Sequence, residues 1–200
     1  MEEITNPIVD WGVAALSLAG EERSGDAHVV KSWEKKLLAA VIDGLGHGGQ
    51  AAVAAGIAAD TLGSYASESA DVVSLVRRCH ESLAGTRGAV LSLALFDAAN
   101  DAMTWLGVGN VEGLLLRADP QAKPARESLL LRGGVVGYQL PSLRSSSTNV
   151  SRGDILIFST DGIRSGFESE VNRRESPQQI ADKIIMNHNG TLQVSSEEGK

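Results

Sequence analysis

The sequence is poor in cysteine and contains no long apolar run. Cys79 is the single cysteine among 200 residues, so it offers neither a disulfide framework nor a cysteine-rich zinc site, and we expect it to pack on a helix. No apolar run approaches the roughly 18 residues of a membrane span. Met1-Glu2-Glu3 also lacks the basic start of a signal peptide. These absences predict a cytoplasmic, non-exported protein with no membrane contact, as a single free cysteine also indicates.

Positive charge and aromatic residues are scarce as well. The chain has 18 Lys and Arg against 25 Asp and Glu, with a net charge of -7, and no basic cluster is longer than Lys35-Lys36 or Arg173-Arg174. This balance argues against nucleic acid as a partner. Aromatic residues make up 4% and hydrophobic residues 42%, which predicts an aliphatic core. The length suits a single domain over residues 1–200.

The order of secondary structure predicts an α+β fold. Helices are predicted over 50–65 and 71–83 as a hairpin, with Val53, Ile57 and Leu62 at helical spacing in the first. A last helix begins at Ser176-Pro177, with Ser as N-cap, and buries Ile180, Ile184 and Ile185. Strands are predicted over 10–18, 27–31, 36–42, 89–96, 102–108, 113–117, 128–132 and 155–159. This order favours two antiparallel sheets flanked by helices, a four-layer α-β-β-α sandwich.

Asp43 stands directly after six consecutive apolar residues. The run 37–42 predicts a buried strand, and the glycines after Asp43 allow a sharp turn into an alanine-rich helix. A carboxylate is costly to desolvate without a positive partner, and no Lys or Arg lies between Leu37 and Arg77. A metal ion would supply that charge. The alternative is that Asp43 caps the following turn or helix.

Two further aspartates have similar settings. Asp26 follows Ser24-Gly25, and Asp161 follows the predicted strand 155–159 within Thr160-Asp161-Gly162. Aspartates, with water and backbone carbonyls, are the ligands of hard ions such as Mg²⁺ and Mn²⁺. The glycine-rich turn after Asp43 is not a phosphate loop, because the Lys-Ser/Thr pair of such a loop is absent.

Six short motifs follow one another between residues 24 and 162. They are Ser24-Gly25-Asp26, Asp43-Gly44-Leu45-Gly46-His47-Gly48, Gly88-Ala89, Gly107-Val108-Gly109-Asn110, Gly133-Gly134-Val135-Val136-Gly137, and Gly153-Asp154 leading to Thr160-Asp161-Gly162. In this order they resemble the metal-dependent protein Ser/Thr phosphatases of the PP2C (PPM) family, and within it the bacterial SpoIIE-like branch. The short chain is most similar to the stressosome phosphatases of that branch.

The resemblance implies a site with two Mn²⁺ or Mg²⁺ ions. Asp43 would bridge both ions, the Gly44 carbonyl would bind one and Asp161 the other, and Asp26 would act directly or through water. Such a site activates a water for in-line attack on phosphorus, without a phosphoenzyme. By the same resemblance, the partners would be phosphorylated STAS-domain proteins of a stressosome-type complex, and the reaction would reset the signal.

Other polar residues near these motifs receive weaker assignments. Animal members of the family carry a general-acid histidine directly after the Asp-Gly pair, but Leu45 holds that position here. His47, two residues further on, either donates a proton or fixes the loop by a hydrogen bond. Asn110 is expected to hold a neighbouring loop, while His28 is interpreted as structural and Arg23 as solvated.

The C-terminal part departs from the family pattern. Members usually end with an Asp-Asp pair that supplies a further metal ligand, whereas residues 187–194 contain no aspartate and Glu197 and Glu198 lie in a polar end. A catalytically weak binding module with the phosphatase fold is therefore the alternative function. Hydrolysis of small phosphoesters is a third hypothesis.

Overall fold

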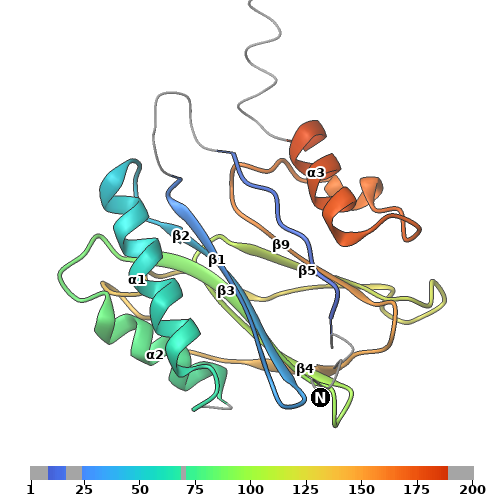
Figure 1. The fold of residues 1–200 in the computed structure, drawn as a ribbon, viewed down its shortest axis with the longest axis horizontal. Helices are drawn as coiled ribbons and strands as arrows, with labels where there is room; N and C mark the ends of the chain where they lie inside the picture. Colours follow the sequence, from blue (N-terminus) through green and yellow to red (C-terminus); the bar gives the residue numbers. More distant parts are fainter. Residues whose placement is uncertain (1–8, 17–23, 69–70, 189–200) are drawn as a thin grey trace, which may run out of the picture.

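The computed structural model describes residues 9–16, 24–68 and 71–188 (Figure 1). In chain order, the elements within these ranges are β1 (Asp26–Trp33), β2 (Lys36–Gly44), α1 (Gly49–Tyr65), α2 (Val72–Ser82), β3 (Ala89–Asp97), β4 (Ala102–Val108), β5 (Glu112–Leu116), β6 (Arg126–Ser128), β7 (Leu131–Arg132), β8 (Ser146–Asn149), β9 (Ile155–Ser159), the 3-10 helix η1 (Phe167–Glu170) and α3 (Pro177–His188). The predicted order of strands, a helix pair, more strands and a last helix is confirmed.

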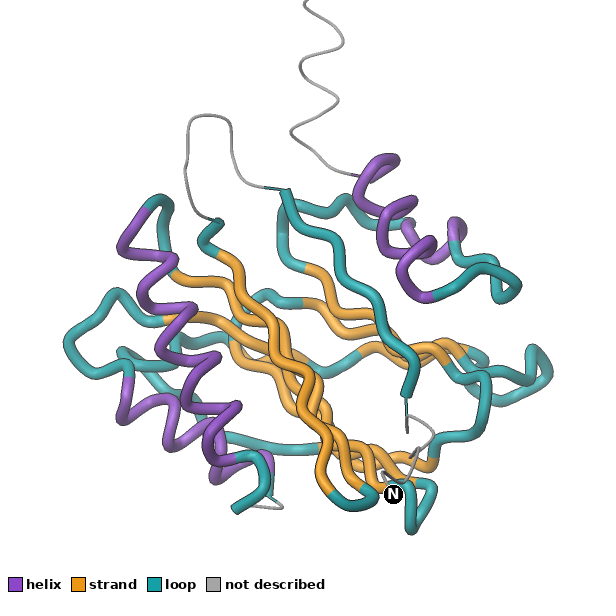
Figure 2. The backbone as a smooth tube through the Cα atoms, viewed as in Figure 1, coloured by secondary structure: helices purple, strands orange, loops and turns teal. Residues whose placement is uncertain are grey.

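The larger sheet has the strand order β1-β2-β3-β4-β7, with β8 also paired to β4 (Figure 2). The strands β1 to β4 are antiparallel neighbours. Their register places Asp26 opposite Asp43 and Gly44 opposite Ala89. The start of β1 and the end of β2, which are separated in the sequence, therefore meet at one end of this sheet.

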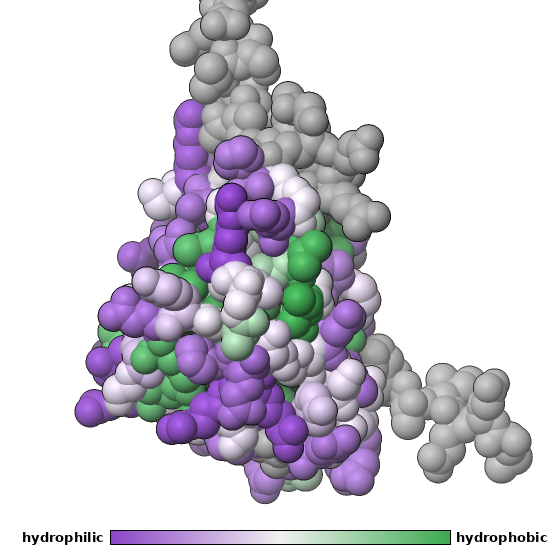
Figure 3. Space-filling view, turned by 90° about the vertical axis from the view of Figure 1, so that its left-hand side faces the viewer, coloured by the Kyte–Doolittle hydropathy of each residue, from purple (hydrophilic) through white to green (hydrophobic). Residues whose placement is uncertain are grey.

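The helices α1 and α2 cover the outer face of the larger sheet (Figure 1). Of the residues at helical spacing in α1, Val53 is 55% exposed, while Leu62 is fully buried. Most buried residues of α1 are alanines, namely Ala51, Ala54, Ala55 and Ala58. Small side chains let the helix lie close to the sheet, so this face is formed largely without bulky residues. Figure 3 shows this side of the molecule, where polar residues surround separate apolar ones.

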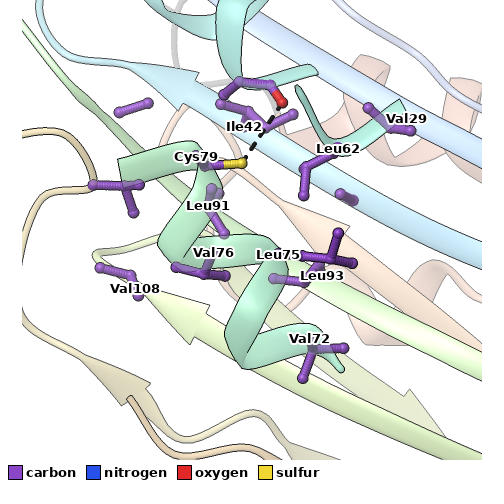
Figure 4. Packing of buried hydrophobic residues seen from close by; sticks show 14 of the residues in the cluster. Val29, Ile42, Leu62, Val72, Leu75, Val76, Cys79, Leu91, Leu93 and Val108 are labelled. Carbon is purple, nitrogen blue, oxygen red and sulfur yellow. Dashed lines mark hydrogen bonds between the residues drawn. The ribbon is translucent and has the colours of Figure 1, made fainter. Parts of the chain in front are cut away.

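Cys79 lies within α2 and is fully buried in the core between the helices and the sheet (Figure 4). Its neighbours include Ile42, Leu91 and Val76, and its Sγ lies 3.8 Å from the carbonyl oxygen of Ala58. Burial raises the pKa of the Cys79 thiol to about 12, so the sulfur remains a neutral packing group. The expected packing role is confirmed.

The smaller sheet has the strand order β6-β5-β9, and α3 covers its outer face. Alternate residues of β5 and β9 point to opposite sides, as the strand period requires. One side meets α3 and η1 through Leu114, Ile155, Ile157, Phe167, Ile180 and Ile184. The other side meets the larger sheet through Leu115, Leu156, Phe158, Ala94, Met103 and Trp105. The expected α-β-β-α order of layers is confirmed.

The start of α3 follows its sequence signal. The backbone amide of Gln179 donates to Ser176 Oγ at 3.3 Å, and the amide of Ser176 donates to Gln179 Oε1 at 2.9 Å. This reciprocal pair is a capping box, with Pro177 at the first helical position. Of the three predicted inner residues, Ile180 and Ile184 are each 6% exposed.

The predicted strand over 10–18 is wrong for its described part. Residues 9–16 form no strand, and residues 17–18 lie outside the described residues. The segment lies against the start of α3, where Gln178 Nε2 donates to the Val13 carbonyl at 2.8 Å and the Val13 amide donates to Gln178 Oε1 at 3.1 Å. A side-chain amide thus satisfies backbone groups that a neighbouring strand would otherwise pair.

Two strand predictions in the second half need correction. The segment 128–132 is not one strand: β6 joins the smaller sheet, and β7 lies parallel to β4 in the larger one. The larger sheet is therefore not purely antiparallel. The strand β8 was missed because Ser146–Asn149 is entirely polar and lacks an apolar alternation, yet it pairs with β4 along four residues.

The absence of a long apolar run predicts that no helix spans a membrane. Among the residues that the structure describes, no helix combines the length and the apolar character that crossing a bilayer requires.

Candidate metal centre

Asp26 and Asp43 lie directly opposite each other on neighbouring strands. Cross-strand partners of this kind have Cβ atoms about 4.5 to 5.5 Å apart, and two like charges in that position repel. The amide of Gly44 donates to the Gly25 carbonyl at 3.0 Å, which continues the pairing past the carboxylates. The fold has therefore brought together two acids that are 17 positions apart in the sequence.

Asp161 reaches the same place from the smaller sheet, directly after β9. The hydroxyl of Thr160 donates to Asp26 Oδ2 at 3.3 Å, which links the two sheets at this end. Asn110 Nδ2 donates to Asp161 Oδ2 at 3.0 Å and holds its carboxylate. Asp26 and Asp161 are exposed and Asp43 is half-buried, so a ligand can reach all three.

The electrostatics of this group are unfavourable in the absence of a cation. Desolvation, followed by the charges of Asp26 and Asp161, raises the pKa of Asp43 from 3.8 to about 6. Desolvation also raises the pKa of Asp26; the hydrogen bond from Thr160 opposes this rise, and the charge of Asp161 adds to it. The charges that act on both groups are negative, which is the condition under which a bound cation stabilises a site most.

The available donors suit a hard divalent ion. Within residues 9–16, 24–68 and 71–188, no three Asp, Glu, His or Cys side chains form a compact metal-binding group. The site consists of the paired carboxylates of Asp26 and Asp43, with the charge of Asp161 acting on both. The Gly44 carbonyl lies at the end of β2, next to Asp43. Oxygen donors completed by water are what Mg²⁺ and Mn²⁺ prefer, so the residues fit such an ion.

Gly44 owes its identity to packing. A Cβ at this position would lie 2.0 Å from the carbonyl oxygen of Ala51 in α1, so only glycine fits between strand and helix. This contact fixes the backbone that follows Asp43. The alternative in which Asp43 caps the helix is wrong, because α1 begins at Gly49 with Gly48 as N-cap and no side chain caps it.

The sequence model of the family described as Stage II sporulation protein E (SpoIIE) matches residues 34–193. The chain belongs to the SpoIIE family. The matched region contains Asp43 and Asp161, and the predicted membership of the SpoIIE-like branch of PP2C phosphatases is confirmed. This SpoIIE-family chain is a PP2C-type protein phosphatase.

The SpoIIE-family chain is similar in sequence and structure to known proteins over most of its length. The phosphoserine phosphatase RsbX of Bacillus subtilis (strain 168) is 28% identical over 177 residues, which cover 87% of this chain and 85% of that protein. A solved structure of RsbX in complex with magnesium has a TM-score of 0.75, with 27% identity over 88% of this chain and 85% of that one. A chain solved in work on the bacterial stressosome has a TM-score of 0.82, with 30% identity over 90% and 92% of the two chains.

A more distant structure supports the fold alone. The PP2C phosphatase domain of SpoIIE from Bacillus subtilis, solved with a fragment of its regulatory domain, has a TM-score of 0.71 and 22% identity. It covers 88% of the SpoIIE-family chain and 56% of that chain.

Asn110 and Thr160 hold the carboxylates by hydrogen bonds, and only one of the two was predicted from the sequence. Asn110 was expected to hold a neighbouring loop, and its hydrogen bond to Asp161 confirms this. The role of Thr160 was missed. The alternation along β9 could have indicated it, because Thr160 follows Leu156 and Phe158 onto the side that faces the other sheet.

The two histidines considered in the sequence have different settings. His47 is exposed in the turn between β2 and α1 of the SpoIIE-family chain, and its role stays a prediction. His28 lies on β1 with its ring centroid 6.1 Å from that of Trp11, which agrees with a structural role. Arg23, residues 189–194, Glu197 and Glu198 lie outside the described residues.

The Gly153-Asp154 motif stabilises the fold at the opposite end of β9. Asp154 accepts hydrogen bonds from the Ala118 amide at 2.6 Å, the Ser151 amide at 3.0 Å and Arg117 Nη1 at 3.1 Å. Burial would raise the pKa of Asp154, but these hydrogen bonds and the charge of Arg117 lower it. Arg117 also pairs with Glu127. This part of the family pattern therefore serves structure, while the site lies at the other end of the strand.

Proposed function

We propose that this protein is a Mg²⁺- or Mn²⁺-dependent phosphatase that hydrolyses phosphoserine or phosphothreonine on STAS-domain proteins of a stressosome-type complex. The observation that carries this proposal is the meeting of Asp26, Asp43 and Asp161 at one end of the two sheets, where burial and neighbouring negative charges raise the pKa values of Asp26 and Asp43. Such a group requires a cation, and a phosphatase fold surrounds it.

The similarity to RsbX and to a chain solved in work on the bacterial stressosome supports the substrate class and the partners. Similarity to RsbX in complex with magnesium supports the choice of ion. A cytoplasmic location and a single domain over residues 1–200 belong to the same proposal, because they suit an enzyme that meets a signalling complex inside the cell.

In the proposed mechanism, Asp43 and the Gly44 carbonyl would bind two ions together with Asp161, and Asp26 would bind directly or through water. When bound, the ions activate a water molecule for in-line attack and neutralise charge on the phosphoryl oxygens. Asn110 orients the carboxylate of Asp161, and Thr160 holds that of Asp26. Such supporting hydrogen bonds set the direction in which a carboxylate offers its lone pairs.

Phosphate release from a phosphoserine peptide tests the proposal. The wild-type protein should release phosphate with Mg²⁺ or Mn²⁺ and stop when a chelator is added, while Asp43→Asn should lose at least about 100-fold in kcat/KM. Asp60→Asn is a matched control, because Asp60 is an exposed acid on α1. Activity that persists in the chelator, or a fully active Asp43→Asn, would rule out the mechanism.

The binding-module alternative has one observation in its favour, the absence of a compact three-acid group among the described residues. It predicts tight association with a phosphorylated STAS-domain protein and negligible turnover at saturating Mn²⁺. Isothermal titration with Mn²⁺ separates the two readings, since the enzyme should bind two ions per chain. A similar rate on a free phosphorylated metabolite and on the phosphopeptide would instead favour a small-phosphoester hydrolase.

A further inference from the structure

Arg87 lies beside the turn that follows Asp43. The pairing of β2 with β3 ends with Gly44 opposite Ala89, and the Leu45 amide then donates to the Gly88 carbonyl at 3.0 Å. One further step in this antiparallel register places Arg87 opposite Gly46. The backbone of Arg87 therefore lies beside the turn three positions past Asp43, in the segment that leads into β3.

The guanidinium of Arg87 lies against the backbone of Gly46. A Cβ on Gly46 would lie 2.5 Å from Arg87 Nη1 and 3.7 Å from its guanidinium carbon. Gly46 also has a φ of 92°, which favours glycine. The glycine thus leaves room for the arginine to lie over the turn, close to the strand end that carries the metal-facing acids.

The donors of Arg87 are not engaged. Among the described residues, Arg87 forms no hydrogen bond or ion pair, and it is exposed. Two other arginines, by contrast, are paired: Arg117 with Glu127 and Asp154, and Arg126 with Glu168. An unpaired guanidinium has five donors in a planar fork that matches a phosphate group.

The negative charge of the protein gives a cation beside the site a role. The three aspartates give the site a negative field, and the whole chain carries a net charge of -7. A phosphomonoester carries close to two negative charges at neutral pH, so its approach to this end of the molecule is opposed. A positive side chain at the rim of the site would attract and orient it.

We propose that Arg87 binds the phosphoryl group of the substrate through its guanidinium. This inference rests on the proposed function and deepens it: the chain supplies its phosphate-binding cation from the segment just before β3. Two parallel N–H···O bonds to the phosphoryl oxygens would fix the ester in one orientation beside Asp43.

The test compares Arg87→Ala, Arg87→Lys and the control Arg152→Ala in the full chain with Mg²⁺. Arg152 is another exposed, unpaired arginine among the described residues, at the opposite end of β9 from Asp161. Each variant is assayed with a phosphoserine peptide and with p-nitrophenyl phosphate, and inorganic phosphate is titrated as a product inhibitor.

Arg87→Ala should raise KM for both substrates by the same factor, about 10- to 100-fold, the range expected for loss of charged hydrogen bonds. The inhibition constant of phosphate should rise by a similar factor. Arg87→Lys should recover part of the loss, because it keeps the charge without the fork. Arg152→Ala should match the wild-type protein, and the melting temperatures of all variants should agree within a few degrees.

Three results would overturn the inference. Unchanged KM and phosphate inhibition in Arg87→Ala would show that the guanidinium does not meet the phosphoryl group. A change with the peptide alone would assign Arg87 to the polypeptide part of the substrate. A loss of kcat with a large fall in melting temperature would show a structural role.

Failure of the proposed function can be told apart from failure of this inference. If the wild-type protein hydrolyses neither substrate, calorimetric titration of inorganic phosphate in the presence of Mg²⁺ still measures the site. Binding by the wild-type protein that Arg87→Ala loses would support the role of Arg87, and equal binding by both proteins would refute it.

Discussion

Replacement of Asp43 by Asn should make the metal-free protein more stable while it removes catalysis. Asn keeps the shape of the side chain but carries no charge. Asp43 faces Asp26 across the strand pair and lies within the influence of Asp161. The charge of Asp43 is therefore a cost to the folded state until a cation binds.

The size of this cost follows from the pKa. The pKa of Asp43 is about 6 in the folded protein against an ordinary value of 3.8, and a difference of about two units corresponds to about 3 kcal/mol. Asp43 is only half-buried, so solvent screening reduces the figure to about 1 kcal/mol. For a domain of this length, such a change raises the melting temperature by about 2 to 4 °C.

The sign of the pH dependence is set by the direction of the shift. A carboxyl with a raised folded pKa destabilises the folded protein above pH 6, and this penalty disappears as the pH falls from about 6 towards 3.8. Asp43→Asn should therefore exceed the wild-type melting temperature at neutral pH in a chelator. The two proteins should become equal near the ordinary pKa of the acid.

Thermal denaturation followed by circular dichroism, with chelator and with saturating Mg²⁺, measures both effects. Mg²⁺ should stabilise the wild-type protein by mass action and leave Asp43→Asn unchanged, so the order of stability reverses. Asp60→Asn controls for the loss of one negative charge and should follow the wild-type protein. A metal-free Asp43→Asn that melts below the wild type at neutral pH would refute the reasoning.

Three further substitutions test the groups around the site. Asp154→Asn should lower the free energy of unfolding in urea by about 2 to 3 kcal/mol, because its arginine and amide partners lose an acceptor. Since the pKa of Asp154 is lowered, this difference between the two proteins should vanish as the pH falls below 3.8 through the folded pKa. A loss of activity without a loss of stability would contradict this prediction. Asn110→Ala frees the carboxylate of Asp161 and should weaken Mg²⁺ binding about 10-fold, as measured by calorimetry. Unchanged affinity would show that the hydrogen bond is dispensable. Thr160→Val removes the hydrogen bond that lowers the pKa of Asp26, so this pKa should rise. The acidic limb of the pH-rate profile should then move to higher pH, and a shift to lower pH would be inconsistent with this geometry.

Local patterns in the sequence predicted the elements that bury one clear face. The apolar run before Asp43 became β2, and Ser176-Pro177 opened α3 through the expected cap. The strand β8 and the loop at 9–16 were not predictable in this way. Polar residues of β8 pair with β4 through backbone groups that every sequence possesses, and the segment 9–16 is satisfied by a side chain of α3.

The amino-acid sequence already specifies which residue types are available to the site: aspartates next to glycines at strand ends, without a local cation. It also determined the family, because motif order persists in the linear chain. Which groups meet depends on the folded chain. The strand register sets Asp26 opposite Asp43, the packing of two sheets brings Thr160 to Asp26, and the continued pairing of β2 with β3 places Arg87 over Gly46. These contacts join distant positions, and the distance between such positions depends on backbone pairing and layer packing that local sequence patterns do not specify.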